Sequence, residues 1–155
     1  QKKSVAFRIP GWCKDFTVNK DYIEKNGYIY IQVAQDDVVK FNFSMPVRFI
    51  SANKRVHTAA GKVAVMRGPV VYCLEGVDNG KDLSAFTVDI KADTEIVEGA
   101  FLVPDIIAKG YKEPDNDALY FEATDDLTEC DLKFIPYYAY ANRGESDMLV
   151  WVRRK

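Results

Sequence analysis

The sequence predicts an all-β protein, an antiparallel β-sandwich, and three observations support this prediction. Apolar and polar residues alternate in short runs such as Val5–Ile9 and Val39–Met45, the pattern of strands with one face in water. Turn-forming pairs such as Asn26-Gly27 separate these runs. No segment repeats its apolar residues about every 3.6 positions over several turns, so about ten short strands without intervening helices are expected.

The stretch Lys62–Glu75 is the expected centre of the sandwich. It contains two apolar runs rich in β-branched and aromatic residues, which favour strands buried on both faces. A Gly-Pro pair joins the runs, because glycine allows the positive φ of a sharp corner and the first residue of a strand can do without its amide. We predict structural roles for Arg67, Gly68, Pro69 and Tyr72. Arg67 in particular is expected to bind a loop carbonyl or a carboxylate.

The remaining strands follow from the same alternation. Before the central stretch, strands are predicted at Val5–Ile9, Phe16–Val18, Tyr28–Val33, Val39–Met45 and Val47–Ser51. After it, strands are predicted at Phe86–Ile90, Ile96–Val97, a short part of Phe101–Lys112, Leu119–Glu122 and Met148–Val152. The last run is uniformly apolar, so we expect a central strand with Trp151 in a structural role. Gly76–Asp82 is expected to be a loop.

Length and composition limit the classes of function. The 155 residues suffice for one ordinary domain or slightly more, and a hydrophobic content of 48% is enough for a core. With 21 basic and 23 acidic residues, the net charge of −2 gives no electrostatic reason to expect nucleic acid or an anionic membrane as a partner. No apolar run approaches the roughly 20 residues of a membrane span. The chain starts at Gln1 without a methionine or a signal peptide, so we expect a piece of a longer protein.

Cysteine and histidine chemistry finds little support in the sequence. Cys13, Cys73 and Cys130 are far apart and odd in number, and they lack the C-x-x-C spacing of a zinc site. Cys73 lies in the most apolar run and is expected to be a buried thiol. The single histidine, His57, has no partner nearby in the sequence and is expected in a surface loop.

Carboxylate chemistry is equally weakly indicated. A glycosidase of the usual kind needs two carboxylates that converge across a cleft. The acidic pairs Asp36-Asp37 and Asp125-Asp126 lie in polar turns, where solvated carboxylates are expected instead. A calcium site at Asp78, Asn79 and Asp82 is an alternative, although their spacing fits no known calcium loop.

Several residues have the chemistry of sugar recognition. Aromatic faces stack on sugar rings, and amides and charges bind sugar hydroxyl groups. The candidate carbohydrate contacts are Trp12, Tyr137, Tyr138, Tyr140, Asn142 and Arg143. The alternative is structural: a strand at 137–140 with partly buried rings, followed by a turn at Arg143-Gly144 that orients the last strand.

Four phrases together resemble one known family. They are RIPGW at Arg8–Trp12, the central stretch, Ile135–Gly144 and Met148–Val152. In this order and spacing they are similar to the C-terminal part of glycoside hydrolase family 127, the family of bacterial β-L-arabinofuranosidases. The resemblance implies an (α/α)6 barrel followed by two β-sandwiches. In that scheme residues 1–45 are the last strands of the middle sandwich and residues 46–155 are the complete C-terminal sandwich, with Pro46 at the join.

The resemblance also implies where the chemistry lies. In the family, a zinc-bound cysteine and a glutamate act in the barrel, whose motifs include Glu-x-Cys and an adjacent Cys-Cys pair. This sequence contains neither motif. No catalytic residue and no metal ligand is carried over, so we expect no hydrolytic activity and no cofactor in this chain. The zinc would belong to the absent barrel.

The expected role is that of the accessory and structural region of a secreted or periplasmic-type bacterial glycoside hydrolase acting on plant glycans that contain L-arabinofuranose. Its expected partner is the (α/α)6 barrel of the same parent chain. Two alternatives stay open: a free-standing carbohydrate-binding module with a glycan partner, and an oligomerisation module. Because residues 1–45 would lack strand neighbours, the isolated fragment is expected to self-associate as a homo-oligomer through their open edges.

Overall fold

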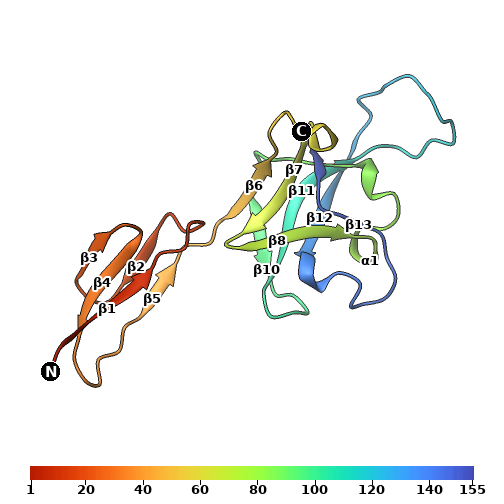
Figure 1. The fold of residues 1–155 in the computed structure, drawn as a ribbon. Helices are drawn as coiled ribbons and strands as arrows, with labels where there is room; N and C mark the ends of the chain where they lie inside the picture. The colour runs from red at the N-terminus through yellow and green to blue at the C-terminus, as the bar shows by residue number, and fades with distance from the viewer. The chain divides into compact units, whose positions relative to one another are not determined.

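The computed structural model describes residues 1–155 and confirms the predicted all-β class, since helical segments are limited to single turns. The chain forms two compact units, unit 1 (Gln1–Pro46) and unit 2 (Val47–Lys155) (Figure 1). The helical turns, all in unit 2, are η1 (His57–Ala59), α1 (Gly76–Asn79), η2 (Leu83–Ala85) and η3 (Tyr137–Ala139). None of them has the length and hydrophobicity needed to cross a bilayer.

Unit 1 consists of two small antiparallel sheets, one with the order β1-β4-β3 and one that pairs β2 with β5. Their strands are β1 (Lys3–Arg8), β2 (Phe16–Val18), β3 (Tyr22–Lys25), β4 (Tyr28–Val33) and β5 (Phe41–Phe43). Asn26 and Gly27, with φ of +54° and +75°, form the tight turn between β3 and β4 that the Asn-Gly pair predicts. The rings of Phe7 and Phe41 lie 4.9 Å apart, so the two sheets pack on each other.

One face of β4 provides the interior of unit 1. Ile29 and Ile31 are fully buried, whereas Tyr28 and Tyr30 are exposed, which confirms the predicted alternation. Together with Cys13, these isoleucines are the only apolar residues of unit 1 that are buried. No apolar alternation predicts β3, and all four of its residues are exposed. Unit 1 therefore has a small interior and a largely exposed outer face.

Unit 2 contains one nine-stranded sheet with the order β13-β8-β12-β11-β9-β14-β7-β6, and β10 pairs with β11 outside this path. The strands are β6 (Val47–Ser51), β7 (Lys62–Arg67), β8 (Val70–Glu75), β9 (Phe86–Val88), β10 (Thr94–Val97), β11 (Asp105–Lys112), β12 (Thr128–Pro136), β13 (Met148–Leu149) and β14 (Val152–Arg154). Since β7 also pairs with β8, the path from β8 round to β7 closes on itself. All pairs are antiparallel except β14 with β9, which is parallel.

The strands of the closed path, together with Leu83 of η2, supply the main hydrophobic core. Its buried members are Val63, Val65, Tyr72, Leu74, Leu83, Phe86, Val88, Ile106, Ala108, Leu132, Phe134 and Val152. In β7 the consecutive residues 63–65 are all buried, so both faces of this strand are covered, as the sequence predicts. Gly68, with φ +55°, and Pro69 form the link between β7 and β8.

Two predictions for the segment between β10 and β12 are wrong. Instead of a short strand, β11 runs for eight residues. Gly110 does not interrupt it, because a Cβ there would lie 2.5 Å from Leu132 Cδ1 and 2.6 Å from the carbonyl oxygen of Thr87, so glycine permits the close approach of neighbouring strands. The predicted strand Leu119–Glu122 does not form, since these residues lie in an irregular segment that pairs with no other strand.

The C-terminal part departs from the prediction in two places. Met148–Val152 is not one strand: β13 pairs with β8, whereas β14 pairs with β7 and β9, and the chain crosses between these neighbours at Val150 and Trp151. Residues 137–139 form a 3-10 turn instead of a strand, with the amide of Tyr140 donating to the carbonyl of Tyr137. The preceding Pro136 has no amide to continue the β ladder.

The loop predicted at 76–82 is only partly a loop, because its first four residues form the helical turn α1.

Candidate functional site

The predicted sugar contacts of unit 2 lie in one segment between β12 and β13, residues 137–147, here called the tyrosine segment. Tyr137 and Tyr138 have exposed fractions of 49% and 57%, and Tyr140 is 37% exposed. The Tyr140 hydroxyl donates a hydrogen bond of 2.9 Å to the carbonyl oxygen of Ser146, which closes the segment on itself. The rings of Tyr137 and Tyr138 are therefore accessible to a ligand, whereas the hydroxyl of Tyr140 is engaged.

Arg143 binds two carboxylates of the same unit. Its Nη2 contacts both Glu75 and Asp78, and its Nη1 donates to Asp78 Oδ1 at 3.0 Å. Glu75 is fully buried and also accepts a hydrogen bond of 3.0 Å from the amide of Ala141. The neighbouring Asn142 is engaged too, since its amide nitrogen donates to a backbone carbonyl at 3.1 Å. These contacts favour the structural alternative for Arg143, because a buried carboxylate without a partner is costly.

Arg143 is part of a larger charge network formed by Glu75, Asp78, Asp105, Lys133 and Arg143. Lys133 Nζ lies 3.1 Å from Asp78 Oδ1 and 3.3 Å from Asp105 Oδ2. Burial would raise the pKa of Asp78, but hydrogen bonds from Arg143 and Lys133 outweigh it and hold the pKa below its ordinary value. Burial would lower the pKa of Lys133, and its hydrogen bond to Asp78 raises it instead. The network joins α1, β8, β11 and β12 to the tyrosine segment.

Asp78 and Asn79, two of the three residues considered for calcium, have other partners. Both oxygens of Asp78 accept from Arg143. The Asn79 amide nitrogen donates to the carbonyl oxygens of Glu75 (3.0 Å) and Lys133 (2.9 Å), and its oxygen accepts from the Lys133 amide at 2.9 Å. Oxygens that already accept from protein donors are poor ligands for a cation, so this segment does not have the chemistry of a calcium loop.

The central hairpin is held by hydrogen bonds to neighbouring backbone. The Tyr72 hydroxyl donates to the carbonyl oxygen of Pro104 at 2.9 Å. Burial raises the pKa of Tyr72, and the nearby positive charge of Arg67 opposes that rise. The sequence predicts that Arg67 binds a loop carbonyl or a carboxylate. At this corner the loop carbonyl is bound by Arg48 instead, whose Nη2 donates to the Gly68 carbonyl oxygen at 2.9 Å.

The two tryptophans lie in different units. Trp12 belongs to unit 1, where its half-buried ring meets the ring of Phe43 edge-on at 6.0 Å. Trp151 lies in unit 2 between β13 and β14 and lines a small hollow of about 250 Å³ with Lys62, Phe86 and Arg153. The predicted sugar contacts between positions 137 and 143 thus lie together in the tyrosine segment of unit 2. Trp12, the remaining predicted contact, lies in unit 1.

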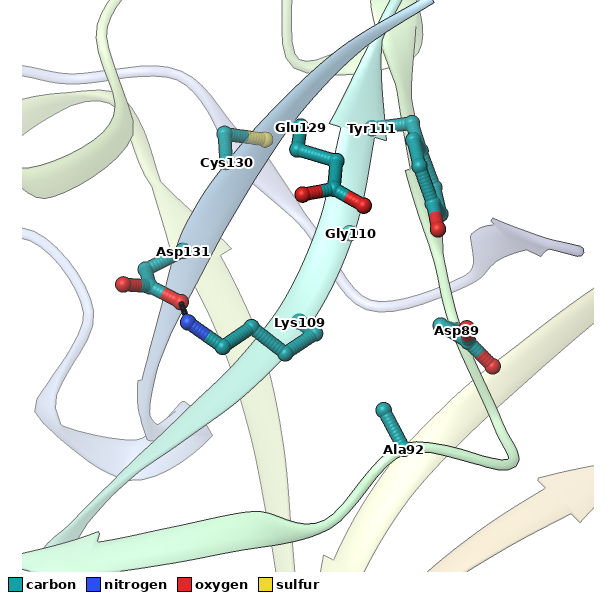
Figure 2. A pocket seen from close by; sticks show the side chains of 8 residues that line it. All are labelled: Asp89, Ala92, Lys109, Gly110, Tyr111, Glu129, Cys130 and Asp131. Carbon is teal, nitrogen blue, oxygen red and sulfur yellow. Dashed lines mark ion pairs between the residues drawn. The ribbon is translucent and has the colours of Figure 1, made fainter.

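A larger hollow of about 460 Å³ lies on the polar face of β11 and β12, and Figure 2 shows its lining side chains. Lys109 and Tyr111 come from β11, Glu129 and Asp131 from β12, and Asp89 from the chain after β9. Lys109 Nζ lies 2.6 Å from Asp131 Oδ1, and this carboxylate raises the pKa of Lys109. Both side chains of the pair are more than half exposed, so it stabilises the fold little.

Sequence reasoning missed this hollow. The only signal is the alternation of charged residues in β12, and the register that sets Lys109 opposite Asp131 and Tyr111 opposite Glu129 becomes visible only in the paired strands. The hollow offers exposed carboxylates and one ammonium group, which can hydrogen-bond a small polar molecule. Cys130 also lines it, but burial raises the pKa of this thiol and so disfavours the nucleophilic thiolate.

The acidic pairs of the sequence are engaged in turns. Asp37 accepts hydrogen bonds of 2.8 Å from the Ala34 amide and from Lys20 Nζ, which hold its pKa below the ordinary value. Asp126 accepts from the hydroxyl of Thr124 at 2.7 Å. A general acid of a glycosidase needs the opposite shift, a raised pKa, so Asp37 does not fit that role.

Cys73 does not have the chemistry of a zinc ligand. Burial raises the pKa of Cys73 to about 12, and the nearby carboxylate of Glu75 adds to the rise. Zinc binds the thiolate, which is disfavoured at such a pKa. No three His, Cys, Asp or Glu side chains gather closely enough to hold a metal ion. His57 is exposed in η1.

Comparison with known proteins places the chain beside one group of enzymes. Residues 47–153 match the model of the glycoside hydrolase family 127 C-terminal domain. The chain is 34% identical, over 97% of its length, to a non-reducing end β-L-arabinofuranosidase of Bifidobacterium longum subsp. longum, of which it covers 26%.

Solved structures agree with this relationship. A GH127 β-L-arabinofuranosidase of Geobacillus stearothermophilus T6 superposes with a TM-score of 0.86 at 37% identity, over 100% of this chain and 27% of that one. A second GH127 β-arabinofuranosidase gives a TM-score of 0.82 at 27% identity, over 100% of this chain and 28% of that one. The chain therefore spans about a quarter of the length of these relatives.

Proposed function

The chain belongs to glycoside hydrolase family 127, and from this we propose that it is the non-catalytic, accessory region of a bacterial glycoside hydrolase acting on plant glycans that contain L-arabinofuranose. The observation that carries the proposal is the match of residues 47–153 to the family's C-terminal domain within relatives about four times as long. In such a protein the reaction takes place in the larger remaining part. This chain contributes packing and rigidity to that part, a barrel of the same polypeptide.

The chemistry of the described side chains supports a non-catalytic role. The most buried carboxylates, Glu75 and Asp105, belong to the charge network and face lysine and arginine partners. The thiols of Cys73 and Cys130 have raised pKa values. Groups that are neutralised or held protonated in this way stabilise a fold but do not supply a base or a nucleophile near neutral pH.

We propose further that unit 1 is part of a larger sandwich, the last strands of the middle sandwich of the family. Its buried apolar residues number only three, Cys13, Ile29 and Ile31. Chains of about 40 residues rarely bury enough surface to be stable alone. A unit of this size with open sheet edges is expected to gain its missing interior from further strands of the parent protein.

An activity assay tests the principal proposal. The chain alone, incubated with a chromogenic β-L-arabinofuranoside, is expected to release no product above the rate in buffer. The full-length relative from Geobacillus stearothermophilus serves as the positive control. Hydrolysis that scales with the concentration of this chain would overturn the proposal. Deletion of the matching region from the relative is expected to lower its thermal midpoint, because the region's packing surface is lost.

The exposure of Tyr137 and Tyr138 favours a second candidate, a carbohydrate-binding module. Two accessible rings on a segment held by the charge network would present a rigid platform to a sugar. Titration with arabino-oligosaccharides, followed by NMR, distinguishes the two functions. Saturable shifts at the backbone amides of residues 139–147 that disappear in the Tyr137→Ala/Tyr138→Ala variant would favour the module, and their absence in the native chain would favour the accessory role alone.

A further inference from the structure

The β1-β4-β3 sheet of unit 1 (Figure 1) has an outer face, the one opposite the buried Ile29 and Ile31. Residues that are paired across antiparallel strands share a face of the sheet, and so do residues two positions apart in one strand. From the register, the outer face consists of Ser4, Ala6, Arg8, Ile23, Lys25, Tyr28, Tyr30 and Gln32. All of these residues are exposed and none is acidic, although the chain as a whole has a net charge of −2.

Two tyrosine rings occupy the middle of the outer face. Tyr28 and Tyr30 are two positions apart in β4, so their side chains leave the sheet about 7 Å from each other. Their exposed fractions are 40% and 38%, which leaves part of each ring accessible. Tyr30 pairs with Ala6, a side chain too small to cover a ring. Aromatic rings presented in this way offer apolar faces on which sugar rings can stack.

Cationic and hydrogen-bonding groups surround these rings. Arg8 and Lys25 lie on either side of Tyr28, since each pairs with it in the register. Ser4 and Gln32 pair with each other at the other end of the face and supply a hydroxyl group and an amide. The outer face therefore combines apolar rings, positive charge and neutral hydrogen-bonding groups.

A groove of about 760 Å³ overlaps the outer face, and this volume is typical of ligand sites. The groove is lined by Lys2, Ser4, Lys20, Asp21, Tyr22, Ile23, Lys25, Tyr30 and Gln32. Asp21 is the only acidic residue in this lining. Lys20 already pairs with Asp37, 2.8 Å away, so Lys2 and Lys25 are the lining cations left for a ligand.

We propose that the outer face of unit 1 binds an acidic glycan, a chain of sugars that includes uronic acids. The rings of Tyr28 and Tyr30 stack on the sugars, and the surrounding cations pair with the uronic carboxylates. The few cations suit a ligand with about one charge per sugar better than the dense charge of a nucleic acid. The proposal rests on the proposed function only in taking the anionic partner to be a glycan. The site is separate from the tyrosine segment, which lies in unit 2.

Calorimetric titration of the chain with oligogalacturonides tests the charge selectivity of this site. Saturable binding is expected at low salt, and it should weaken as salt screens the carboxylates. Methyl esters of the same oligosaccharides keep the sugar rings but lose the charge, so they are expected to bind at least about fivefold more weakly. An absence of binding, equal affinity for the esters, or equal affinity for single-stranded DNA would each overturn the proposal.

Substitutions on the outer face test the location of the site. Lys2→Gln/Lys25→Gln is expected to weaken oligogalacturonide binding about fivefold, because two exposed charge pairs are lost. Both lysines are exposed, so the variant should keep its fold, which circular dichroism checks. The matched control is Lys54→Gln/Lys91→Gln, which removes two exposed lysines of unit 2 and should leave the affinity unchanged. Equal effects of the two variants would show that the net charge, and not this face, governs binding.

The tyrosines give a second, independent readout. Tyr28→Ala/Tyr30→Ala is expected to weaken binding at least as much as the lysine variant, whereas Tyr28→Phe/Tyr30→Phe keeps the rings and should retain most of the affinity. Tyr137→Ala/Tyr138→Ala changes two exposed tyrosines of unit 2 and should have no effect. A loss confined to this last variant would overturn the proposal. Hydrolysis by the chain would contradict the proposed function without changing these affinities, so the two failures are distinguishable.

Discussion

Units 1 and 2 follow the same alternation of apolar and polar residues but bury very different interiors. In unit 1 the buried apolar residues are limited to Cys13, Ile29 and Ile31, whereas unit 2 has a cluster of twelve buried core members. The difference lies in connectivity: the sheet of unit 2 closes through the pairing of β7 with β8, while unit 1 has two small separate sheets. Alternation marks the face that can be buried, and closure with further strands decides how much of it becomes core.

The two tryptophans make this comparison measurable, because each unit contains one of them. In Trp151→Phe the fluorescence reports unit 1 through Trp12, and in Trp12→Phe it reports unit 2 through Trp151. Urea unfolding of these two backgrounds gives a separate transition for each unit. The following substitutions are read in both backgrounds.

The largest expected effect is that of Phe134→Ala in the core of unit 2. Phe134 is fully buried in β12, so its truncation leaves a cavity that costs about 3–5 kcal/mol in the free energy of unfolding. The Trp151 transition should move to lower urea, and the Trp12 transition should stay in place. An equal shift of both transitions would show that the units unfold as one.

Arg143→Met tests the charge network of unit 2. It leaves the carboxylates of Glu75 and Asp78 without their arginine, which is expected to cost about 2–3 kcal/mol, less than a fully buried pair, since the Arg143 side chain is 23% exposed. The free energy of unfolding of the variant should also depend less on pH in the acid range. Asp78 has a folded pKa below its ordinary 3.8, so its contribution is present above that value and is lost as the pH falls through the lower folded pKa. If the unfolding curves of Arg143→Met and of the native chain are the same between pH 2 and pH 6, the network does not have this role.

Ile31→Val tests how tightly the small interior of unit 1 is packed. Ile31 is fully buried, and the loss of one methylene group is expected to cost about 0.5–1.5 kcal/mol. Only the Trp12 transition should respond. A negligible effect there would show that the interior of unit 1 is too loosely packed to register a missing methylene.

The smallest effect is expected for Lys109→Gln at the hollow of Figure 2. This removes an ion pair with Asp131 whose side chains are 66% and 56% exposed, and such pairs contribute about 0–1 kcal/mol. The Trp151 transition should therefore change less than in Arg143→Met, although both substitutions remove one positive charge from unit 2. A loss of stability as large as that of Arg143→Met would mean that side-chain exposure does not determine how much these two ion pairs contribute.

Much of the fold can be predicted from the sequence where the signal is local. The Asn26-Gly27 turn, the burial of Ile29 and Ile31, and the burial of residues 63–65 are all confirmed. The errors occur where the outcome depends on a distant partner. Apolar residues at Leu119–Phe121 meet the composition of a strand but have no strand beside them, and Gly110 looks like a break until the close approach of Leu132 is known.

The candidate site was predictable only as a list of residue types. Tyr137, Tyr138 and Arg143 stand out in the sequence, but nothing near them in the chain shows that Arg143 pairs with Glu75, 68 positions away. Glu75 itself ends an apolar run, and nothing in that run indicates that its carboxylate has a charged partner. The hollow on β11 and β12 likewise depends on strand register.

By itself the sequence determined that this protein is built from short strands and where its central hairpin turns, because both depend on residues close together in the chain. It also determined which family the chain resembles, through the order and spacing of four short phrases. Only the tertiary structure decided the division of Met148–Val152 between two sets of neighbours, the buried partners of Arg143, and the exposure of Leu119 and Tyr120. The physical reason is that strand pairing and charge burial are long-range: a residue's partner is set by the closure of the sheet, which no local pattern encodes.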